Sequence, residues 1–210
     1  QPGEAPDRYL IAVKREPESR GGSASLHERV QVGDLLRVGP PRNHFPLVRE
    51  AGHSLLLAGG IGLTPLLAMA RALARAGRSF ELHVFARSLG HVPFGADLAQ
   101  EFHGRLHLHL GLDAPGTQHM LHGVLDAPGA DTHVYGCGPA SFMQAIAEAA
   151  RARGCPEARV HFEHFKAPAA VSQDGPAFEL RLARSGLSTT VRSGQSAVEA
   201  IRALGLAVET

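Results

Sequence analysis

The chain has 210 residues, of which 44% are hydrophobic and 20% are charged, and its formal net charge is +1 at pH 7. This composition is that of an ordinary globular protein, and the small net charge gives no basic field of the kind that binds nucleic acid or an anionic membrane surface. No apolar run approaches the roughly 20 residues that span a bilayer, and the first residues do not resemble a signal peptide. The two cysteines, Cys137 and Cys155, are too few for a disulfide framework or a four-thiolate metal site. We therefore expect a reduced, soluble, cytoplasmic protein without a nucleic acid or membrane partner.

Residues 1–48 carry only short elements. Tyr9–Lys14 and Leu35–Val38 are apolar and β-rich, which predicts two strands. Between them Ser23 can cap a short helix that starts there. Three such elements cannot bury a core of their own. This segment is therefore predicted to be the C-terminal part of a β-domain.

Residues 49–166 alternate between strand and helix patterns. The apolar run Ser54–Ala58 is typical of a strand that is buried on both faces. The helix Leu66–Ala76 is rich in Ala, Leu and Arg and ends at Gly77. The further expected elements are strands at 80–86, 105–110, 133–135 and 159–162, a loop after the first of these, and a helix at 140–153 that ends at Gly154. Such alternation predicts an α/β domain with a parallel sheet covered by helices on both faces.

The last part of the chain changes pattern again. Residues 167–176 are polar and rich in turn-forming residues, which predicts a linker. In residues 177–210, Phe178–Ala183 and Leu187–Val191 flank a Ser-Gly turn and predict a hairpin. A helix follows at Ala197–Leu204, with Ser196 as its cap and Gly205 as its stop. A hairpin followed by a helix is how a β-grasp domain starts.

The strongest motif is Gly59-Gly60-Ile61-Gly62-Leu63-Thr64-Pro65, which joins a buried strand to a helix. Glycines let the backbone approach a phosphate closely, and the helix directs free N–H groups and its positive dipole end toward an anion. We expect Thr64 at the N-cap and Pro65 at the first helical position. The loop differs from the G-x-G-x-x-G fingerprint, so a purely structural turn is the alternative.

A second strand-to-helix turn is Tyr135-Gly136-Cys137-Gly138-Pro139. Turns at the carboxyl ends of parallel strands can face a shared crevice, the usual ligand site of open α/β sheets. Cys137 lies at that edge and is the candidate catalytic residue, although a small buried core residue is the alternative. The context of Cys155 indicates a structural residue.

Weaker candidates are Arg87 and Ser88, at the end of the second strand of the α/β pattern, and Gly21, Gly22 and Ser23, at the predicted first helix. The Arg87 guanidinium suits the adenosine end of a dinucleotide, with a solvated surface arginine as the alternative. The glycines of the second group could cradle a phosphate, but a simple turn explains them better.

Thirteen histidines raise the question of a metal site. His107 and His109 share one face of a strand, and His119 and His122 have helical spacing. Neither pair has a nearby carboxylate or thiol as a third ligand in the sequence pattern. We therefore expect hydrogen-bonded or solvated histidines and no metal site.

Six motifs in this order resemble the phthalate dioxygenase reductase and vanillate O-demethylase reductase group of the ferredoxin reductase superfamily. They are RGGS, GPPRNHFPL, LLLAGGIGLTP, FARS, YGCGP and HFEHF, at residues 20–23, 39–47, 55–65, 85–88, 135–139 and 161–165. The resemblance implies an FMN-binding β-barrel, an NAD-binding α/β domain and a plant-type [2Fe–2S] domain. It also implies electron transfer from NADH to a Rieske oxygenase acting on aromatic acids. The family's flavin motif would precede residue 1, and its cysteine-rich cluster loop would follow Thr210.

The resemblance also implies roles for single residues. The glycine turn would hold the phosphates of the nicotinamide nucleotide, the FARS motif would face its adenosine, the YGCGP motif would lie beside its nicotinamide, and two further groups would contact FMN, with FAD the less favoured flavin. The phosphate-binding residues of the glycine turn would be Gly59, Gly60, Gly62, Thr64 and Pro65, and the residues facing adenosine would be Arg87 and Ser88. The residues beside the nicotinamide would be Cys137, Gly138 and Pro139. For the flavin, Gly21, Gly22 and Ser23 would contact its phosphate and Phe165 its ring.

The resulting hypothesis is an NADH-dependent reductase that passes a hydride to a flavin and single electrons onward to an iron–sulfur centre and an oxygenase. NADPH stays an alternative because Arg87 could meet a 2′-phosphate. Three different functions also stay open: a transferase with an adenosyl cofactor, a non-catalytic NAD-binding module, and a flavin reductase with another acceptor. The hypothesis requires the turns at 59–65 and 136–139 to lie together.

Overall fold

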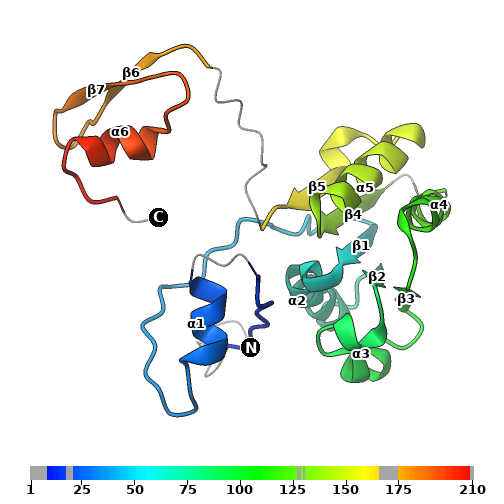
Figure 1. Ribbon diagram of the computed structural model, residues 1–210. Helices are drawn as coiled ribbons and strands as arrows, with labels where there is room; N and C mark the ends of the chain where they lie inside the picture. Colours follow the sequence, from blue (N-terminus) through cyan, green and yellow to red (C-terminus); the bar gives the residue numbers. More distant parts are fainter. Residues whose placement is uncertain (1–8, 18–20, 127–128, 130, 166–174, 209–210) are drawn as a thin grey trace. The chain divides into compact units, whose positions relative to one another are not determined.

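The computed structural model describes residues 9–17, 21–126, 129, 131–165 and 175–208 (Figure 1). The chain forms two units, Gln1–Phe165 and Lys166–Thr210. Most of the linker expected at 167–176 lies outside the described residues. The two units are described separately below.

The first unit contains a five-stranded parallel sheet with the order β3-β2-β1-β4-β5. Its strands are β1 His53–Gly59, β2 Phe80–Ala86, β3 Leu106–Leu110, β4 Thr132–Cys137 and β5 Val160–Glu163. The central strand β1 is buried from Ser54 to Gly59, which explains its continuous apolar run. The prediction of a parallel α/β sheet is confirmed.

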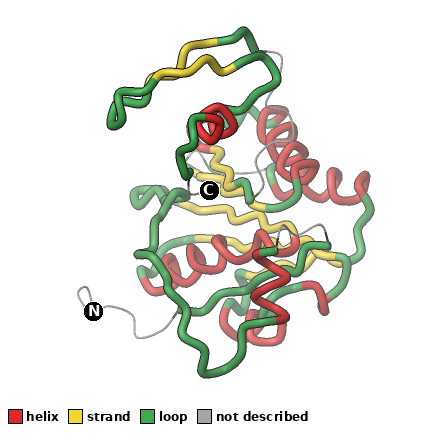
Figure 2. Tube along the Cα trace, turned by 60° about the vertical axis from the view of Figure 1, so that its left-hand side comes forward, coloured by secondary structure: helices red, strands yellow, loops and turns green. Residues whose placement is uncertain are grey.

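Helices cover both faces of this sheet, and the strands run between them in Figure 2. Alternate β1 residues point to opposite faces. Leu56 packs with the helices α2 Leu63–Arg75 and α3 Gly95–Glu101. Leu55 and Leu57 pack instead with the helices α4 Ala114–Val124 and α5 Ala140–Ala152.

The expectation of a loop after β2 is wrong, and a further helix was not predicted. A 3-10 turn, Leu89–His91, and α3 follow β2. The seven residues of α3 give too short a window for a periodic pattern. The other unpredicted helix, α4, contains Pro115 and Gly116 in its first turn, and Asp113 caps it by accepting from the Gly116 N–H at 2.8 Å. Among the helices in the described ranges, none is long and apolar enough to cross a membrane.

The two strands expected before residue 49 are also wrong. Residues 9–14 and 35–38 form no strand. Tyr9, Leu10 and Ile11 are 60–68% exposed. A strand forms only where a neighbour satisfies its backbone groups, and these segments pair with none among the described residues.

A short helix does form in this region, as expected. It is α1 Gly22–Glu28, and its N-cap is Gly21, with φ of 114°. Ser23 is therefore not the cap. Its Oγ accepts instead from the Glu16 N–H at 3.2 Å.

Residues 45–48 are anchored to the sheet by Tyr135 of β4, which is fully buried. The Val48 N–H donates to the Tyr135 hydroxyl at 2.9 Å. The Phe45 ring meets the Tyr135 ring edge-on, with 5.8 Å between centroids. One side chain of β4 thus fixes the path of the chain before β1.

We expect Tyr135→Phe to lower the free energy of unfolding by about 1–3 kcal/mol, because the Val48 N–H loses its acceptor while the ring contact with Phe45 stays. Urea unfolding measures this loss. Tyr9→Phe is the control, since Tyr9 is 60% exposed and the change should have no effect. Equal stability of the two variants would show that the hydroxyl anchors nothing.

The second unit is a hairpin with one helix. The strands β6 Phe178–Arg181 and β7 Ser188–Val191 are antiparallel, and Gly186 in their turn has φ of 70°. The helix α6 Ala197–Ala203 starts with a capping box between Ser196 and Glu199, and it packs on β7. The predicted hairpin and its following helix are confirmed.

Candidate functional site

The first glycine turn leads from β1 directly into α2. Gly60–Gly62 form a 3-10 turn, and α2 begins at Leu63 with Gly62 as its N-cap. The expected positions of Thr64 and Pro65 are therefore wrong by two residues. The Thr64 hydroxyl donates to the Ile61 carbonyl at 3.1 Å. Pro65 is tolerated as the third helical residue because the first four N–H groups of a helix have no intrahelical acceptor.

This turn has the features of an anion site. The helix α2 has 13 residues, so its N-terminus carries a full dipole. Gly60 has φ of 56°, and no atom lies within 4 Å of the place that a Cβ would take. The backbone there is open to a ligand, and a side chain would be strained.

The second glycine turn lies against the first. β1 and β4 are neighbouring parallel strands, with Ala58 opposite Cys137. A Cβ on Gly62 would lie 2.2 Å from the Cys137 carbonyl oxygen, and a Cβ on Gly59 would lie 3.3 Å from Gly138 Cα. The prediction that the two turns lie together is confirmed. They meet where the strand order reverses between β1 and β4, which is the usual ligand position in such sheets.

Cys137 has its backbone at this edge, while its side chain packs in the core with Leu56 and Tyr135 and is 1% exposed. Burial, and after it the Glu163 carboxylate, raise the pKa of the thiol to about 12. The thiol is therefore neutral at physiological pH and is not a nucleophile in this state. Cys155 is half-buried and packs beside the core on the α4–α5 face, in keeping with a structural role.

Arg87 and Ser88 lie beside the first turn along the same edge. Phe85 of β2 is opposite Gly59, so Arg87 follows two residues beyond that pair. Both residues are exposed. Ser88 Oγ lies 2.9 Å from His91 Nδ1, whereas the Arg87 guanidinium has no partner among the described residues. Arg87 thus places a cation at the carboxyl edge of the sheet.

The flavin candidates form separate groups. Gly21, Gly22 and Ser23 lie at the start of α1, whose side chains contact the preceding residues: His27 Nε2 lies 2.8 Å from the Val13 carbonyl. Phe165 follows the end of β5 and is 54% exposed. In the described part of the chain, no hydrogen bond joins Gly22, Ser23 or Phe165 to the glycine turns.

The expectation that His107 lacks a carboxylate neighbour is wrong. Glu81 Oε2 lies 4.0 Å from His107 Nε2 and 3.2 Å from Nε2 of His83. Burial lowers the pKa of His83 to about 4 and also lowers that of His109. The signal that could have found this cluster is the pair of alternating patterns Glu81-x-His83 and His107-x-His109 on strands that become neighbours.

No protein-family model matches the chain. A vanillate O-demethylase oxidoreductase of Pseudomonas putida is 44% identical over 202 residues, which cover 96% of this chain and 64% of that protein. The solved phthalate dioxygenase reductase superposes with a TM-score of 0.71 at 35% identity, covering 94% of this chain and 62% of that one. A type IV self-sufficient cytochrome P450 monooxygenase superposes with a TM-score of 0.80 at 32% identity, and the match covers 95% of this chain and 26% of that one.

The first four curated relatives are matched over 33–66% of their own length, so this chain spans less than two thirds of each. The similarity runs through both glycine turns and into the second unit, since it covers 92–99% of this chain. It agrees with the resemblance carried by the six sequence motifs and with the parallel sheet of the first unit. The chain belongs to the phthalate dioxygenase reductase and vanillate O-demethylase reductase group of the ferredoxin reductase superfamily.

Proposed function

We propose that the chain binds a nicotinamide dinucleotide along the carboxyl edge of its parallel sheet. The observation that carries this proposal is the direct contact between the turns at 59–65 and 136–139, at the point where the strand order reverses. The pyrophosphate would lie on the first turn, held by backbone N–H groups of Gly60, Gly62 and Thr64. The nicotinamide would lie beside the second turn, near Cys137, Gly138 and Pro139.

The residues present fit such a ligand. The open backbone at Gly60 leaves room for a phosphate. Pro65 lacks an N–H, but at this position in the first turn the helix makes no hydrogen bond through that group. Arg87, which is exposed and has no partner in the described parts of the chain, suits the adenosine end, and Ser88 lies next to it. NADH is proposed as the ligand, with NADPH as the alternative if Arg87 meets a 2′-phosphate.

The proposed activity is that of the reductase component of an oxygenase system. It is supported by the family and by the solved phthalate dioxygenase reductase, which is described as a modular structure for electron transfer from pyridine nucleotides to [2Fe-2S]. Bound nicotinamide and flavin supply the hydride and electron chemistry, so the protein needs no general acid or base of its own. Its residues bind and orient the two groups, and the backbone of Cys137 would border the nicotinamide while its thiol stays in the core.

The flavin, its acceptor and the domain roles are further parts of the proposal. FMN is proposed to contact Gly21, Gly22 and Ser23 with its phosphate and Phe165 with its ring. Residues 1–48 would belong to the flavin domain, residues 49–166 would form the nucleotide domain, and residues 177–210 would begin the [2Fe–2S] domain. The hairpin and α6 support the last assignment. Electrons would pass through an iron–sulfur centre to a Rieske-type aromatic-ring oxygenase or O-demethylase.

Binding of nucleotide to the chain tests the proposal. We expect Arg87→Gln to weaken binding about tenfold, a loss of about 1.4 kcal/mol, because one charged contact to the adenosine end is removed. Arg75→Gln, at the opposite end of α2, is the matched control and should bind as the unchanged chain does. Calorimetric titration with NADH and with NADPH measures both, and a larger loss for NADPH would reveal contact with the 2′-phosphate.

Three results separate the competing functions. Failure of the unchanged chain to bind either nucleotide would remove the proposal. Loss of flavin absorbance when NADH is added to the protein carrying FMN supports a reductase, whereas nucleotide binding without flavin reduction indicates a non-catalytic module. Electron transfer to a purified oxygenase, and not only to artificial acceptors, separates the oxygenase reductase from another flavin reductase.

A further inference from the structure

A cluster of histidines and one glutamate lies on the face of the sheet, apart from the glycine turns. Glu81, His83 and Phe85 alternate along β2, and His107 and His109 alternate along β3, so all five side chains lie on one face. His83 is opposite His107 in the strand register, and Phe85 is opposite His109. Phe85 belongs to the core under α4 and α5, which places the cluster on that face of the sheet.

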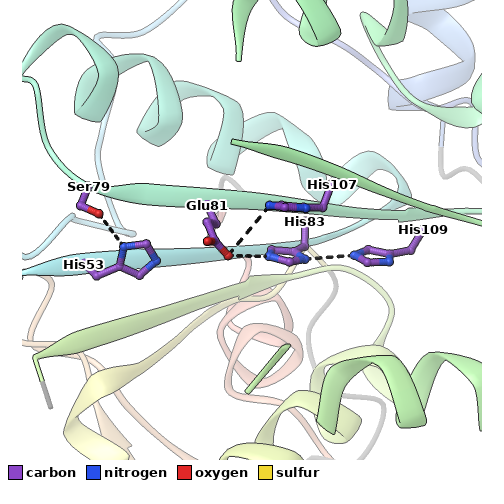
Figure 3. A network of polar contacts seen from close by, with 6 residues as sticks. All are labelled: His53, Ser79, Glu81, His83, His107 and His109. Atoms are coloured by element: carbon purple, nitrogen blue, oxygen red, sulfur yellow. Dashed lines mark hydrogen bonds and ion pairs between the residues drawn. The ribbon is translucent and has the colours of Figure 1, made fainter. Parts of the chain in front are cut away.

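Three side chains converge on one point. Figure 3 shows the Glu81 carboxylate directed at both the His83 and His107 rings. Glu81 Oε2 lies 3.2 Å from His83 Nε2 and 4.0 Å from His107 Nε2, and the three ligand atoms lie within 4.8 Å of one another. Tetrahedral ligands at about 2.0–2.1 Å from a zinc ion lie about 3.3 Å apart. Small side-chain rotations would bring these atoms to that spacing.

One atom of the cluster makes no hydrogen bond to the described residues. His107 Nε2 is buried and has no hydrogen-bond partner among the described residues. Leaving a buried polar atom unsatisfied costs about 1–3 kcal/mol, so such an atom in a folded protein calls for an explanation. A cation between His107 and Glu81 would satisfy it.

The remaining contacts orient the His83 ring in the way that a metal-binding histidine is oriented. His83 Nδ1 lies 3.0 Å from His109 Nε2. The His109 ring in turn stacks on Phe85, with 4.4 Å between centroids. Metal-binding histidines use the second ring nitrogen in this way, because the outer hydrogen bond fixes the tautomer and the ring orientation. With a cation bound, His83 would donate its Nδ1–H to His109 and direct the lone pair of Nε2 at the ion.

The geometry points to a binding site for a divalent cation of the zinc class, with Glu81, His83 and His107 as ligands and His109 as the positioning residue of His83. Two imidazoles and one carboxylate suit Zn²⁺, Co²⁺ or Ni²⁺ and not the oxygen-seeking Ca²⁺ or Mg²⁺. The Glu81 side chain is 47% exposed, so a cation could reach the site from solvent along its carboxylate. The bound ion would link β2 to β3. This site is independent of the nucleotide site, whose turns lie at the carboxyl edge.

Titration of the metal-free chain with Zn²⁺ against a chromophoric chelator tests the site, and the visible spectrum of bound Co²⁺ reports its ligands. We expect one tight equivalent in the unchanged chain. Glu81→Gln and His107→Gln should each lose it and change the Co²⁺ spectrum. His109→Gln should bind 10–100-fold more weakly, as expected for a residue that acts through a ligand. His119→Gln, at an exposed position of α4, is the control for binding by surface histidines.

Two ligand variants keep the test decisive if one of them folds poorly. Absence of saturable Zn²⁺ binding would leave the cluster as a hydrogen-bonded chain from Glu81 to His109 and would overturn the site. Unchanged affinity in either Glu81→Gln or His107→Gln would also overturn it, as would an equal loss in His119→Gln. Nucleotide titrations of the same variants should match the unchanged chain, so failure of this site and failure of the nucleotide site are distinguishable.

Discussion

Gly62→Ala should destabilise the first unit by about 3 kcal/mol or more, or prevent its folding, because its new Cβ would overlap the backbone of β4. The Cβ would lie 2.2 Å from the Cys137 carbonyl oxygen and 2.8 Å from the Gly138 N. Neither atom can rotate away, so β1 and β4 would have to separate. Gly62 has φ of −60°, which alanine adopts without strain. The whole effect therefore comes from the contact between the two turns.

Urea unfolding of Gly62→Ala beside Gly123→Ala measures this contact. Gly123 lies in α4, and nothing lies within 4 Å of its Cβ position. Alanine there should leave stability unchanged or raise it by up to about 1 kcal/mol. Any Gly62→Ala protein that folds should also bind nicotinamide nucleotide more weakly, since the turns no longer meet. Stability within about 1 kcal/mol of the unchanged chain would show that β1 and β4 adjust without cost.

Cys137 should react with iodoacetamide about 1000-fold more slowly in the folded protein at pH 8 than in urea. Only the thiolate reacts, and raising the pKa of this thiol from 9 to about 12 lowers the thiolate fraction by three powers of ten. Cys155→Ala leaves Cys137 as the chain's single thiol, so the rate then belongs to that residue. Mass spectrometry of timed samples gives the two rates.

The same shift in pKa predicts how stability depends on pH. Because folding raises the pKa of Cys137, its contribution is complete below pH 9 and is lost as the pH rises toward 12. The slope is at most about 1.4 kcal/mol for each pH unit. Cys137→Ala should lack this slope, whereas Cys155→Ala should keep it.

For the labelling experiment, rapid reaction of folded Cys137 with iodoacetamide at pH 8 would contradict a buried thiol and favour a reactive one.

Several features of the fold could be predicted because they are local. The apolar run at 54–58 marks a strand buried on both faces, and Gly77 and Gly154 mark helix ends through their positive φ values. Strand–helix alternation then predicts the parallel sheet. The turns at 59–65 and 136–139 each follow a strand, so both are expected at the carboxyl edge of that sheet, where ligands bind. The hairpin of the second unit followed from its own turn and alternation in the same way.

Other features depend on partners that a local pattern does not contain. The β-rich segments at 9–14 and 35–38 form no strand, because strand formation requires a paired neighbour. The short helix α3 is held by Leu98 and Phe102, which pack under the sheet. In each case the presence or absence of a pairing strand or a packing partner elsewhere in the chain outweighs local propensity.

The sequence by itself determined the elements of the sheet and the two glycine turns, since each follows from residue types and spacing within one segment. The common edge of the two turns followed from the general rule that ligand turns lie at the carboxyl ends of parallel strands. Only the tertiary structure decided that α2 begins at Leu63, that the thiol of Cys137 is buried, and that Glu81 meets His83 and His107. The physical reason is strand register: it sets Ala58 opposite Cys137 and His83 opposite His107. A shift of one residue in either pairing would turn these side chains to the other face.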